Sequence, residues 1–251
     1  MPGRPRKLVV PAGALRLGEW LLPADIARYV AKVLRQEPGA HLELSDGAGT
    51  FAAGTILRIR RDEVVVQVRT VWTTPFLEPE LVVLQGLAKG EKMDRLVRQA
   101  TELGVSRIVP VHCDRSVPEG KGRSERWRAI AEDAVRVSGR GFRPEIAEVM
   151  PVGRALADVS SELRIVLTPN ASEGLGKHLC ARSGMTSAAI LVGPEGGLTE
   201  AEVSLAEMHG FLAAHLGARV LRTETAGVAV LAVLQFVLGG FDLRLTGGPP
   251  T

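Results

Sequence analysis

The sequence predicts an α/β protein with two domains, a β-rich module in residues 1–73 and a larger α/β domain in residues 74–251. Only 4% of the residues are aromatic whereas 45% are apolar, so the core must be built from Val, Leu, Ile and Ala, which suits buried strands covered by helices. β-type alternation fills the first part of the chain, and strand and helix patterns alternate in the second. This alternation is typical of a mostly parallel sheet with helices packed on it.

Short strands separated by turn residues predict the N-terminal module. The expected strands are His41 to Asp46, Thr55 to Arg60 and Glu63 to Val68. Turn residues lie between them, at Asp46-Gly47-Ala48-Gly49 and at Arg61-Asp62. One helix is expected from Pro23 to Leu34, and the prolines at positions 75 and 79 predict a linker. A small β-barrel-like module is the expected result.

The C-terminal domain is expected to alternate between strands and helices. The expected strands are Leu81 to Leu87, Arg107 to His112, Arg164 to Thr168, Ala188 to Val192 and Phe211 to Leu216. The expected helices are Glu91 to Leu103, Ser124 to Val137, Thr199 to His209 and Thr225 to Leu238. Ser124 would cap the second helix, Thr199 and Glu202 have the spacing of a capping box, and Thr223 or Thr225 would cap the last helix. That last helix is apolar nearly all round, which predicts burial in a core or an interface.

Composition and motifs argue against several classes of protein. The longest apolar stretch, Gly227 to Phe241, contains Gln235 and is shorter than the roughly 20 residues that span a bilayer, so we expect no membrane segment. The two cysteines are far apart and the five histidines lack ligand spacing, so we expect a cytoplasmic protein without a metal. The sequence contains no G-x-G-x-x-G, P-loop or G-x-S-x-G motif.

Two glycine-containing segments each follow a predicted strand and lead into a predicted helix. In Gly193-Pro194-Glu195-Gly196-Gly197, the missing Cβ atoms allow the backbone to approach a ligand closely. The second segment, Leu216 to Ala226, places Arg222 and Glu224 beside the start of the last helix. Open α/β sheets usually bind ligands at the carboxyl ends of their strands. Each segment alone is also compatible with a structural turn, in the second case with an ion pair and a helix cap.

Together with the rest of the chain, these segments resemble the ribosomal RNA small subunit methyltransferase E family, whose members methylate N3 of a uridine in 16S rRNA. The two glycine-containing segments carry the strongest resemblance. Further matches are Asp46-Gly47-x-Gly49, Lys89 through Arg98, Ala100 to Val105, Arg115-Ser116-Val117, and Ser138-Gly139-Arg140 with Pro144.

The resemblance implies a SPOUT-class methyltransferase. Its fold would be an RNA-binding, PUA-like β-barrel followed by an α/β domain with a deep trefoil knot. It would be a homodimer that binds S-adenosylmethionine (SAM) in the knot loops and acts on small-subunit rRNA within an assembled 30S particle. The residues expected to contact SAM are Leu167, Thr168, Pro169, Gly193, Pro194, Glu195, Gly196, Gly197, Leu216, Gly217, Leu221, Arg222, Thr223, Glu224, Thr225 and Ala226.

Four charged residues are candidates for catalysis. The proton on uridine N3 must leave as the methyl group arrives, because neutral N3 is a poor nucleophile. Negative charge then develops on the ring oxygens, where Arg222 or Arg98 could stabilise it with a forked donor. Glu195 or Glu224 could accept the proton or orient the base, and the sequence does not choose between them. For Glu102, four residues after Arg98, a surface ion pair with that arginine is the favoured interpretation.

Arginines are the expected RNA contacts. They are Arg6, Arg28, Arg35, Arg58 and Arg60 in the N-terminal module, and Arg136 and Arg140 in a stretch between Glu119 and Arg143 that has seven basic and four acidic residues. This stretch is equally compatible with a solvated helix.

The chain departs from the family pattern at two places. Arg28-Tyr29 replaces a His-His pair, and Arg136-Val137 replaces a Glu-Gln pair. The alternative functions are another knotted methyltransferase, acting on tRNA or a ribose 2'-hydroxyl, and a non-catalytic RNA-binding assembly factor.

Overall fold

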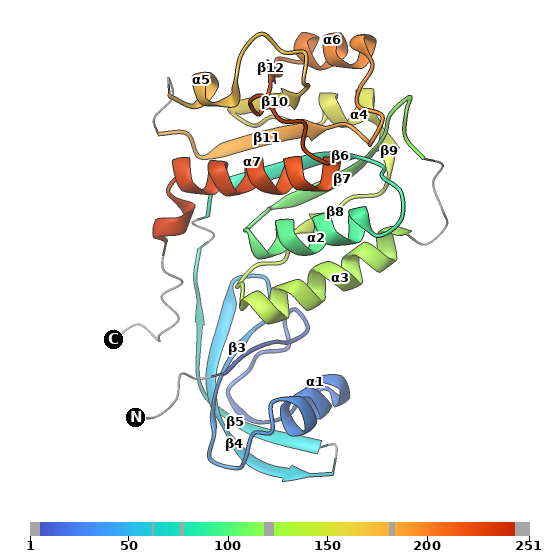
Figure 1. Cartoon of the computed structure of the whole chain (residues 1–251). Coiled ribbons are helices and arrows are strands. Elements are labelled where there is room, and N and C mark those ends of the chain that lie inside the picture. Colours follow the sequence, from blue (N-terminus) through green and yellow to red (C-terminus); the bar gives the residue numbers. More distant parts are fainter. Residues whose placement is uncertain (1–5, 62, 76–77, 118–122, 181–183, 244–251) are drawn as a thin grey trace. The chain divides into compact units, whose positions relative to one another are not determined.

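The computed structural model describes residues 6–61, 63–75, 78–117, 123–180 and 184–243, which form two compact units (Figure 1). Unit 1 comprises the described parts of residues 1–77 together with residues 135–143. Unit 2 comprises the described parts of residues 78–134 and 144–243. The division into folding domains at residues 73 and 74 stays a prediction.

Unit 1 is built on a five-stranded sheet with the strand order β1-β3-β4-β5-β2. The strands are β1 (Arg6–Val9), β2 (Gly18–Leu21), β3 (His41–Ser45), β4 (Thr50–Arg60) and β5 (Glu63–Thr73). β1 pairs with β3 in parallel, and the other neighbours are antiparallel. The sequence patterns did not predict β1 and β2. Closure of this sheet into a barrel stays a prediction.

A short helical segment covers the core of unit 1. The single helix expected from Pro23 to Leu34 is α1 (Ala24–Arg28) followed by a π-helical turn, Tyr29–Val33. Ile26, Ala27 and Val30 are buried and pack with strand residues such as Leu42 and Leu44. The apolar side of the helix is therefore fixed by burial against the sheet.

The turn between β3 and β4 explains why residues 135–143 belong to unit 1. Oδ1 of Asp46 accepts hydrogen bonds from the backbone N–H groups of Ala48 (2.8 Å) and Thr50 (3.0 Å), as in an Asx turn. The Arg143 guanidinium donates to the carbonyl oxygens of Asp46 and Val10. A Cβ at Gly47 would lie 2.1 Å from Arg143 Nη1, so the Arg143 side chain can take this position only if residue 47 is glycine.

Unit 2 contains a seven-stranded sheet with the order β12-β10-β11-β6-β7-β8, and β9 pairs with β7. The strands are β6 (Glu80–Gly86), β7 (Arg107–His112), β8 (Glu145–Ile146), β9 (Met150–Pro151), β10 (Leu163–Leu167), β11 (Ser187–Val192) and β12 (Leu212–Ala214). Every pair in this sheet is parallel. The carboxyl ends of its strands therefore lie at one edge.

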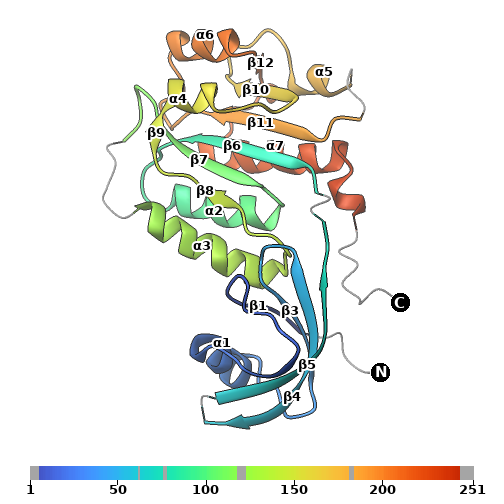
Figure 2. The same ribbon diagram turned by 180° about the vertical axis from the view of Figure 1, so that it is seen from behind.

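Helices cover both faces of this sheet (Figure 2). Leu81 and Val83 of β6 face a core shared with α2 (Lys92–Glu102), α3 (Arg123–Ser138), α5 (Leu175–Cys180) and α7 (Thr223–Val237). Val82 and Leu84 face the opposite core, with α4 (Val152–Ala157) and α6 (Glu200–Met208). Alternate side chains of one strand thus serve two cores, as expected of a buried parallel strand.

One predicted helix cap is confirmed and two are wrong. Thr199 Oγ1 accepts from the Glu202 N–H at 3.2 Å, and Glu202 Oε2 accepts from the Thr199 N–H at 2.8 Å, which completes the capping box of α6. Ser124 lies inside α3 and cannot cap it. Arg222 is the N-cap of α7, without a side-chain hydrogen bond, so neither Thr223 nor Thr225 caps that helix.

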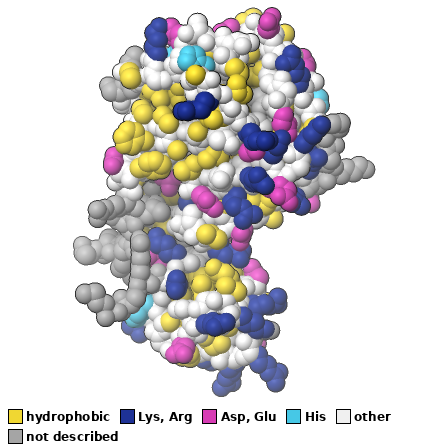
Figure 3. Space-filling view, viewed as in Figure 1, with side chains coloured by type: hydrophobic (Ala, Val, Ile, Leu, Met, Phe, Trp, Pro, Cys, Tyr) yellow, Lys and Arg dark blue, Asp and Glu magenta, His cyan; other side chains and the backbone are white. Residues whose placement is uncertain are grey.

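The apolar surface of α7 is only partly buried within one chain. Val230, Leu231 and Leu234 are buried, while Phe236 is 74% exposed and Val233 is 40% exposed. Apolar side chains gather over α7 in Figure 3. Among the described residues, no helix is long and apolar enough to cross a membrane, and no group of three or more His, Cys, Asp or Glu side chains could hold a metal.

Candidate functional site

The segments with the strongest family resemblance lie at the same edge of the unit 2 sheet. β10, β11, β12 and β6 run in parallel, so the residues that follow each strand emerge at the same edge. This edge brings together residues 167–169, 193–199 and 215–222, and it adds residues 86–91 after β6. Binding at the carboxyl edge of a parallel sheet is the general rule for α/β proteins.

The loop after β11 is packed closely on the end of β6. A Cβ at Gly193 would lie 2.9 Å from Gly197 C and Leu198 N, so the turn closes on itself only with glycine there. A Cβ at Gly86 would lie 2.5 Å from Pro194 N. Gly86 was missed by the sequence patterns, although a glycine at the end of an apolar strand is a signal of close backbone approach.

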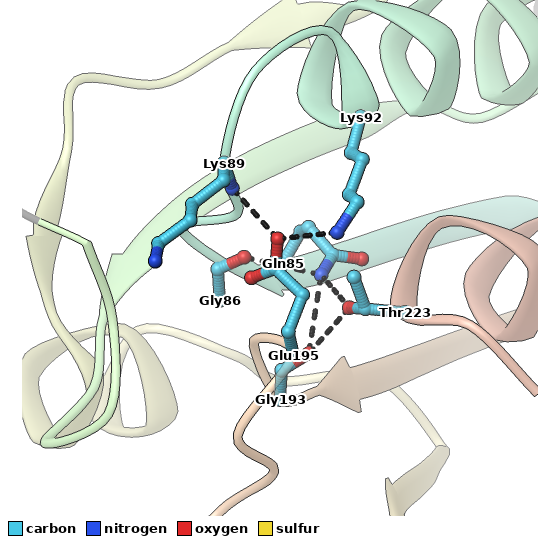
Figure 4. Close-up of polar contacts among 7 residues, drawn as sticks. All are labelled: Gln85, Gly86, Lys89, Lys92, Gly193, Glu195 and Thr223. Carbon is cyan, nitrogen blue, oxygen red and sulfur yellow. Dashed lines mark hydrogen bonds and ion pairs between the residues drawn. The ribbon is translucent and has the colours of Figure 1, made fainter. Parts of the chain in front are cut away.

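A buried hydrogen-bond network joins this loop to the start of α7 (Figure 4). Gln85 Nε2 donates to Thr223 Oγ1 at 2.8 Å, and the Thr223 hydroxyl donates to the Gly193 carbonyl oxygen at 2.5 Å. The Thr223 hydroxyl is thus engaged within the protein. Gln85 is the second residue that the sequence patterns missed, and a polar side chain at the end of an otherwise apolar strand could have indicated it.

Glu195 is held by the segment that follows β6. Its Oε1 accepts from the backbone N–H of Lys89 at 2.9 Å and lies 2.6 Å from Lys92 Nζ (Figure 4). Burial acts to raise the pKa of Glu195, but the hydrogen bonds from Lys92 and Lys89 outweigh it and lower the pKa below the usual value of 4.5. A carboxylate held in this way is a weak proton acceptor.

Glu224 differs from Glu195 because part of its carboxylate is free. It lies in the first turn of α7 and is 8% exposed. Among the described residues, its Oε2 has no hydrogen-bond partner. A buried carboxylate oxygen without a partner is costly, which makes Glu224 a candidate for binding or catalysis. Arg222 is exposed one residue before the helix, and no ion pair with Glu224 is present among these residues.

The segment between β12 and α7 is held by hydrogen bonds where it begins, and it borders open space at Gly217. His215 Nδ1 accepts from the Gly217 N–H at 3.0 Å, and the Thr168 N–H donates to the Ala214 carbonyl oxygen at 3.1 Å. Gly217 has φ +88°, a conformation that favours glycine. In the part of the chain that the structure describes, no atom lies within 4 Å of a Cβ built at Gly197 or Gly217, so both glycines border open space.

Arg98 lies away from this network, on the exposed side of α2. It lines a groove of about 490 Å³ with Arg95, Arg126 and Asp94. The described residues include no ion pair between Arg98 and Glu102, so the favoured interpretation of Glu102 was wrong. Arg126 pairs with Asp94 in the groove instead. Catalysis by Arg98 stays a prediction.

The arginines predicted to contact RNA differ in exposure. Arg6, Arg28, Arg35, Arg58 and Arg60 are exposed. Basic side chains gather over α1, β4 and β5 in Figure 3. Arg136 is half-buried, and its guanidinium carbon lies 5.7 Å from the centre of the Tyr29 ring, which is a cation–π contact. Arg140 is only 4% exposed, so RNA would reach it only if its segment moved.

Comparisons with known proteins match both parts of the chain to RNA methyltransferase families. The family described as RNA methyltransferase domain matches residues 77–235, and the family described as RNA methyltransferase PUA domain matches residues 22–69. The chain is 30% identical to ribosomal RNA small subunit methyltransferase E of Bacillus subtilis over 230 residues, covering 86% of this chain and 89% of the relative. The Mycobacterium bovis protein of the same name is 29% identical over 232 residues, covering 88% of each chain.

Solved structures agree with these relatives. A ribosomal RNA small subunit methyltransferase E from Neisseria gonorrhoeae bound to S-adenosyl methionine has a TM-score of 0.82 and 30% identity, covering 93% of this chain and 98% of that chain. A methyltransferase from Legionella pneumophila in complex with the bound cofactor SAM has a TM-score of 0.80, the same identity and the same coverage. The fold, the family matches and the relatives agree, and the chain belongs to the ribosomal RNA small subunit methyltransferase E family.

Proposed function

We propose that this protein transfers a methyl group from SAM to N3 of a uridine in 16S rRNA. The observation that carries the proposal is the buried, unpartnered Oε2 of Glu224, one residue after Thr223, whose hydroxyl contacts the glycine loop after β11. Membership in the methyltransferase E family supports rRNA as the substrate. The protein would act in the cytoplasm, on RNA within an assembled 30S particle.

The edge of the unit 2 sheet fits SAM. Gly197 and Gly217 border open space that a Cβ would enter, which suits close backbone contact with a nucleoside. Residues 167–169, 193–197 and 216–226 would hold the cofactor, largely through backbone groups. We propose that these loops are threaded as a trefoil knot of the SPOUT class, as membership in the family implies. When bound, SAM supplies an electrophilic methyl carbon.

Two side chains at the start of α7 would act on the uridine. Glu224 would accept the N3 proton if substrate binding exposes its buried, unpartnered Oε2, whereas the Glu195 carboxylate is held by Lys92 and Lys89. Arg222 is exposed beside it and would stabilise the negative charge that develops on the ring oxygens. The positive end of the α7 dipole would add to that stabilisation.

RNA binding and dimerisation would involve surfaces outside this site. The exposed arginines of unit 1 would neutralise phosphates, in agreement with the PUA domain match. The exposed apolar side chains of α7, Val233, Phe236 and Val237, would pack against a second copy of the chain.

The test uses purified protein, unmethylated 30S particles and SAM with a labelled methyl group. Nuclease digestion and mass spectrometry identify the modified nucleoside. The proposal predicts 3-methyluridine at one position. Label in a ribose 2'-O-methyl nucleoside, or in tRNA instead of 30S particles, would support a different knotted methyltransferase. No methyl transfer and no SAM binding by calorimetry would support a non-catalytic RNA-binding protein.

A further inference from the structure

The carboxamide of Gln85 lies where three segments of unit 2 meet. The side chain is 1% exposed at the end of β6. Its Nε2 lies 2.8 Å from Thr223 Oγ1, 3.2 Å from the Gly86 carbonyl oxygen and 3.4 Å from the Gly193 carbonyl oxygen. An amide nitrogen has two hydrogens, so the bonds to Thr223 and Gly86 are the stronger ones. Figure 4 shows the end of β6, the loop after β11 and the start of α7 converging on this side chain.

Thr223 extends the contact from Gln85 to the glycine loop. Its hydroxyl accepts from Gln85 and donates to the Gly193 carbonyl oxygen at 2.5 Å. A hydroxyl that accepts one hydrogen bond and donates another has a fixed orientation. The direction of the first turn of α7, which includes Glu224, is thereby tied to the loop that begins at Gly193.

Apolar burial does not explain a glutamine at this place. The preceding residues of β6 are apolar and buried, and a leucine would fill a similar volume. Among the described residues, Oε1 of Gln85 has no hydrogen-bond partner. An unpartnered buried acceptor reduces the stability of the fold. The amide is therefore accounted for by the three groups that its Nε2 joins, the Gly86 and Gly193 carbonyl oxygens and the Thr223 hydroxyl.

We propose that Gln85 is a positioning residue, which through Thr223 fixes the loop after β11 relative to Glu224 at the start of α7. The proposal rests on the function proposed above, in which this loop holds SAM and Glu224 receives the proton. Methyl transfer is sensitive to errors of position of about 1 Å between the reacting groups. Loss of the network would weaken SAM binding and turnover together without removing a group that contacts either substrate.

The test combines variants at both ends of the network with a matched control. Gln85→Leu removes the amide, Thr223→Val removes the hydroxyl and Thr223→Ser keeps it. Gln99→Leu makes the same change on the exposed side of α2. Calorimetry with SAM gives the Kd, methyl transfer to 30S particles gives kcat, and thermal denaturation gives the Tm of each variant.

We expect Gln85→Leu and Thr223→Val each to raise the Kd for SAM about tenfold, because SAM binding would then have to order the loop that the network holds in place in the wild type. Gln99→Leu should stay close to the wild type, and Thr223→Ser, which keeps the hydroxyl, should bind SAM more tightly than Thr223→Val. The double variant should be no worse than the poorer single variant, because both changes interrupt one network.

A lower Tm with an unchanged Kd and kcat in Gln85→Leu would overturn the proposal and leave a structural role. If Gln85→Leu does not fold, the Kd for SAM of Thr223→Val tests the proposal in its place. A wild-type Kd in Thr223→Val would then overturn the proposal. The wild-type protein tests the proposed function separately, since its failure to bind SAM would contradict that function.

Discussion

Lys92 Nζ lies 2.6 Å from Glu195 Oε1, so an ion pair joins the first turn of α2 to the loop after β11. The two side chains are separated by 103 positions in the sequence. Both are partly exposed, at 25% and 31%, which limits the contribution of the pair to stability through solvent screening. The contact nevertheless determines the chemistry of Glu195, because it stabilises the charged form of the carboxylate.

Glu195→Gln should reduce the free energy of unfolding at pH 7 by at most about 1 kcal/mol, because the pair is partly exposed. The folded-state pKa of Glu195 is lowered below 4.5, so this contribution is present above the unfolded-state pKa and is lost as the pH falls through the folded-state value. Urea denaturation at pH 7 and pH 3 measures it. A difference from the wild type that persists unchanged at pH 3 would contradict this account, and Glu207→Gln on the exposed side of α6 is the control.

Glu224→Gln should lower kcat by about 10²-fold, because the amide keeps the shape of the side chain but cannot accept the proton. The Kd for SAM should change little, since backbone groups are proposed to hold the cofactor. Single-turnover methyl transfer to 30S particles measures the effect. Glu200→Gln, also in the first turn of a helix, is the matched control. Wild-type turnover in Glu224→Gln would remove Glu224 as the proton acceptor.

Arg222→Ala should lower turnover by about 10²-fold or more if the guanidinium stabilises charge in the transition state. Arg154→Ala, which removes an exposed arginine of α4, is the control. Steady-state kinetics with 30S particles separates kcat from KM. Unchanged turnover with intact cofactor binding would exclude Arg222 from the mechanism.

Replacing Arg28 and Arg35 together by Ala should weaken RNA binding and its dependence on salt. Each phosphate contact contributes about 0.7 to 0.9 to the steepness with which the logarithm of the binding constant falls with the logarithm of the salt concentration. Loss of two contacts should therefore make this slope shallower by roughly 1.4 to 1.8. Fluorescence anisotropy with an RNA fragment over a salt series measures it. Both side chains are exposed, so the fold should be retained, unlike in a variant of the buried Arg140. An identical slope would place the RNA on another surface.

Phe236→Asp should convert the proposed dimer into a monomer, because it places a charge in the apolar surface of α7. Met208→Asp on α6 is the control, since the two side chains are similarly exposed, at 74% and 76%. Sedimentation equilibrium measures the mass of each variant. A wild-type protein that is monomeric at micromolar concentration, or a dimeric Phe236→Asp variant, would contradict the proposed interface.

Local sequence patterns predicted much of unit 2. The stripe of Met93, Leu96, Val97 and Ala100 is buried in α2 as its spacing indicates, and Gly104 follows the helix with φ +89°. The capping box of α6 was predicted from two residues three positions apart. These signals could be read from the sequence because helix periodicity and capping involve residues within one or two turns of each other.

Four short strands were not predicted. β1 and β2 have four residues each, and β8 and β9 have two each. Segments of this length contain too few residues to show a period, and they form strands because a neighbouring strand supplies their hydrogen bonds. The cap expected at Thr223 failed for a related reason, since its hydroxyl bonds to Gly193, 30 positions away.

The sequence by itself determined the family, the alternation of strands and helices, and the two glycine segments that mark the candidate site. The tertiary structure decided which carboxylate in that site is free: Glu195 is held by Lys92, while Glu224 keeps an unpartnered oxygen. It also brought Gln85 to Thr223 across 138 positions, and Arg143 to Asp46 across 97. Such contacts arise from the packing of distant segments around shared cores, and no pattern of neighbouring residues encodes them.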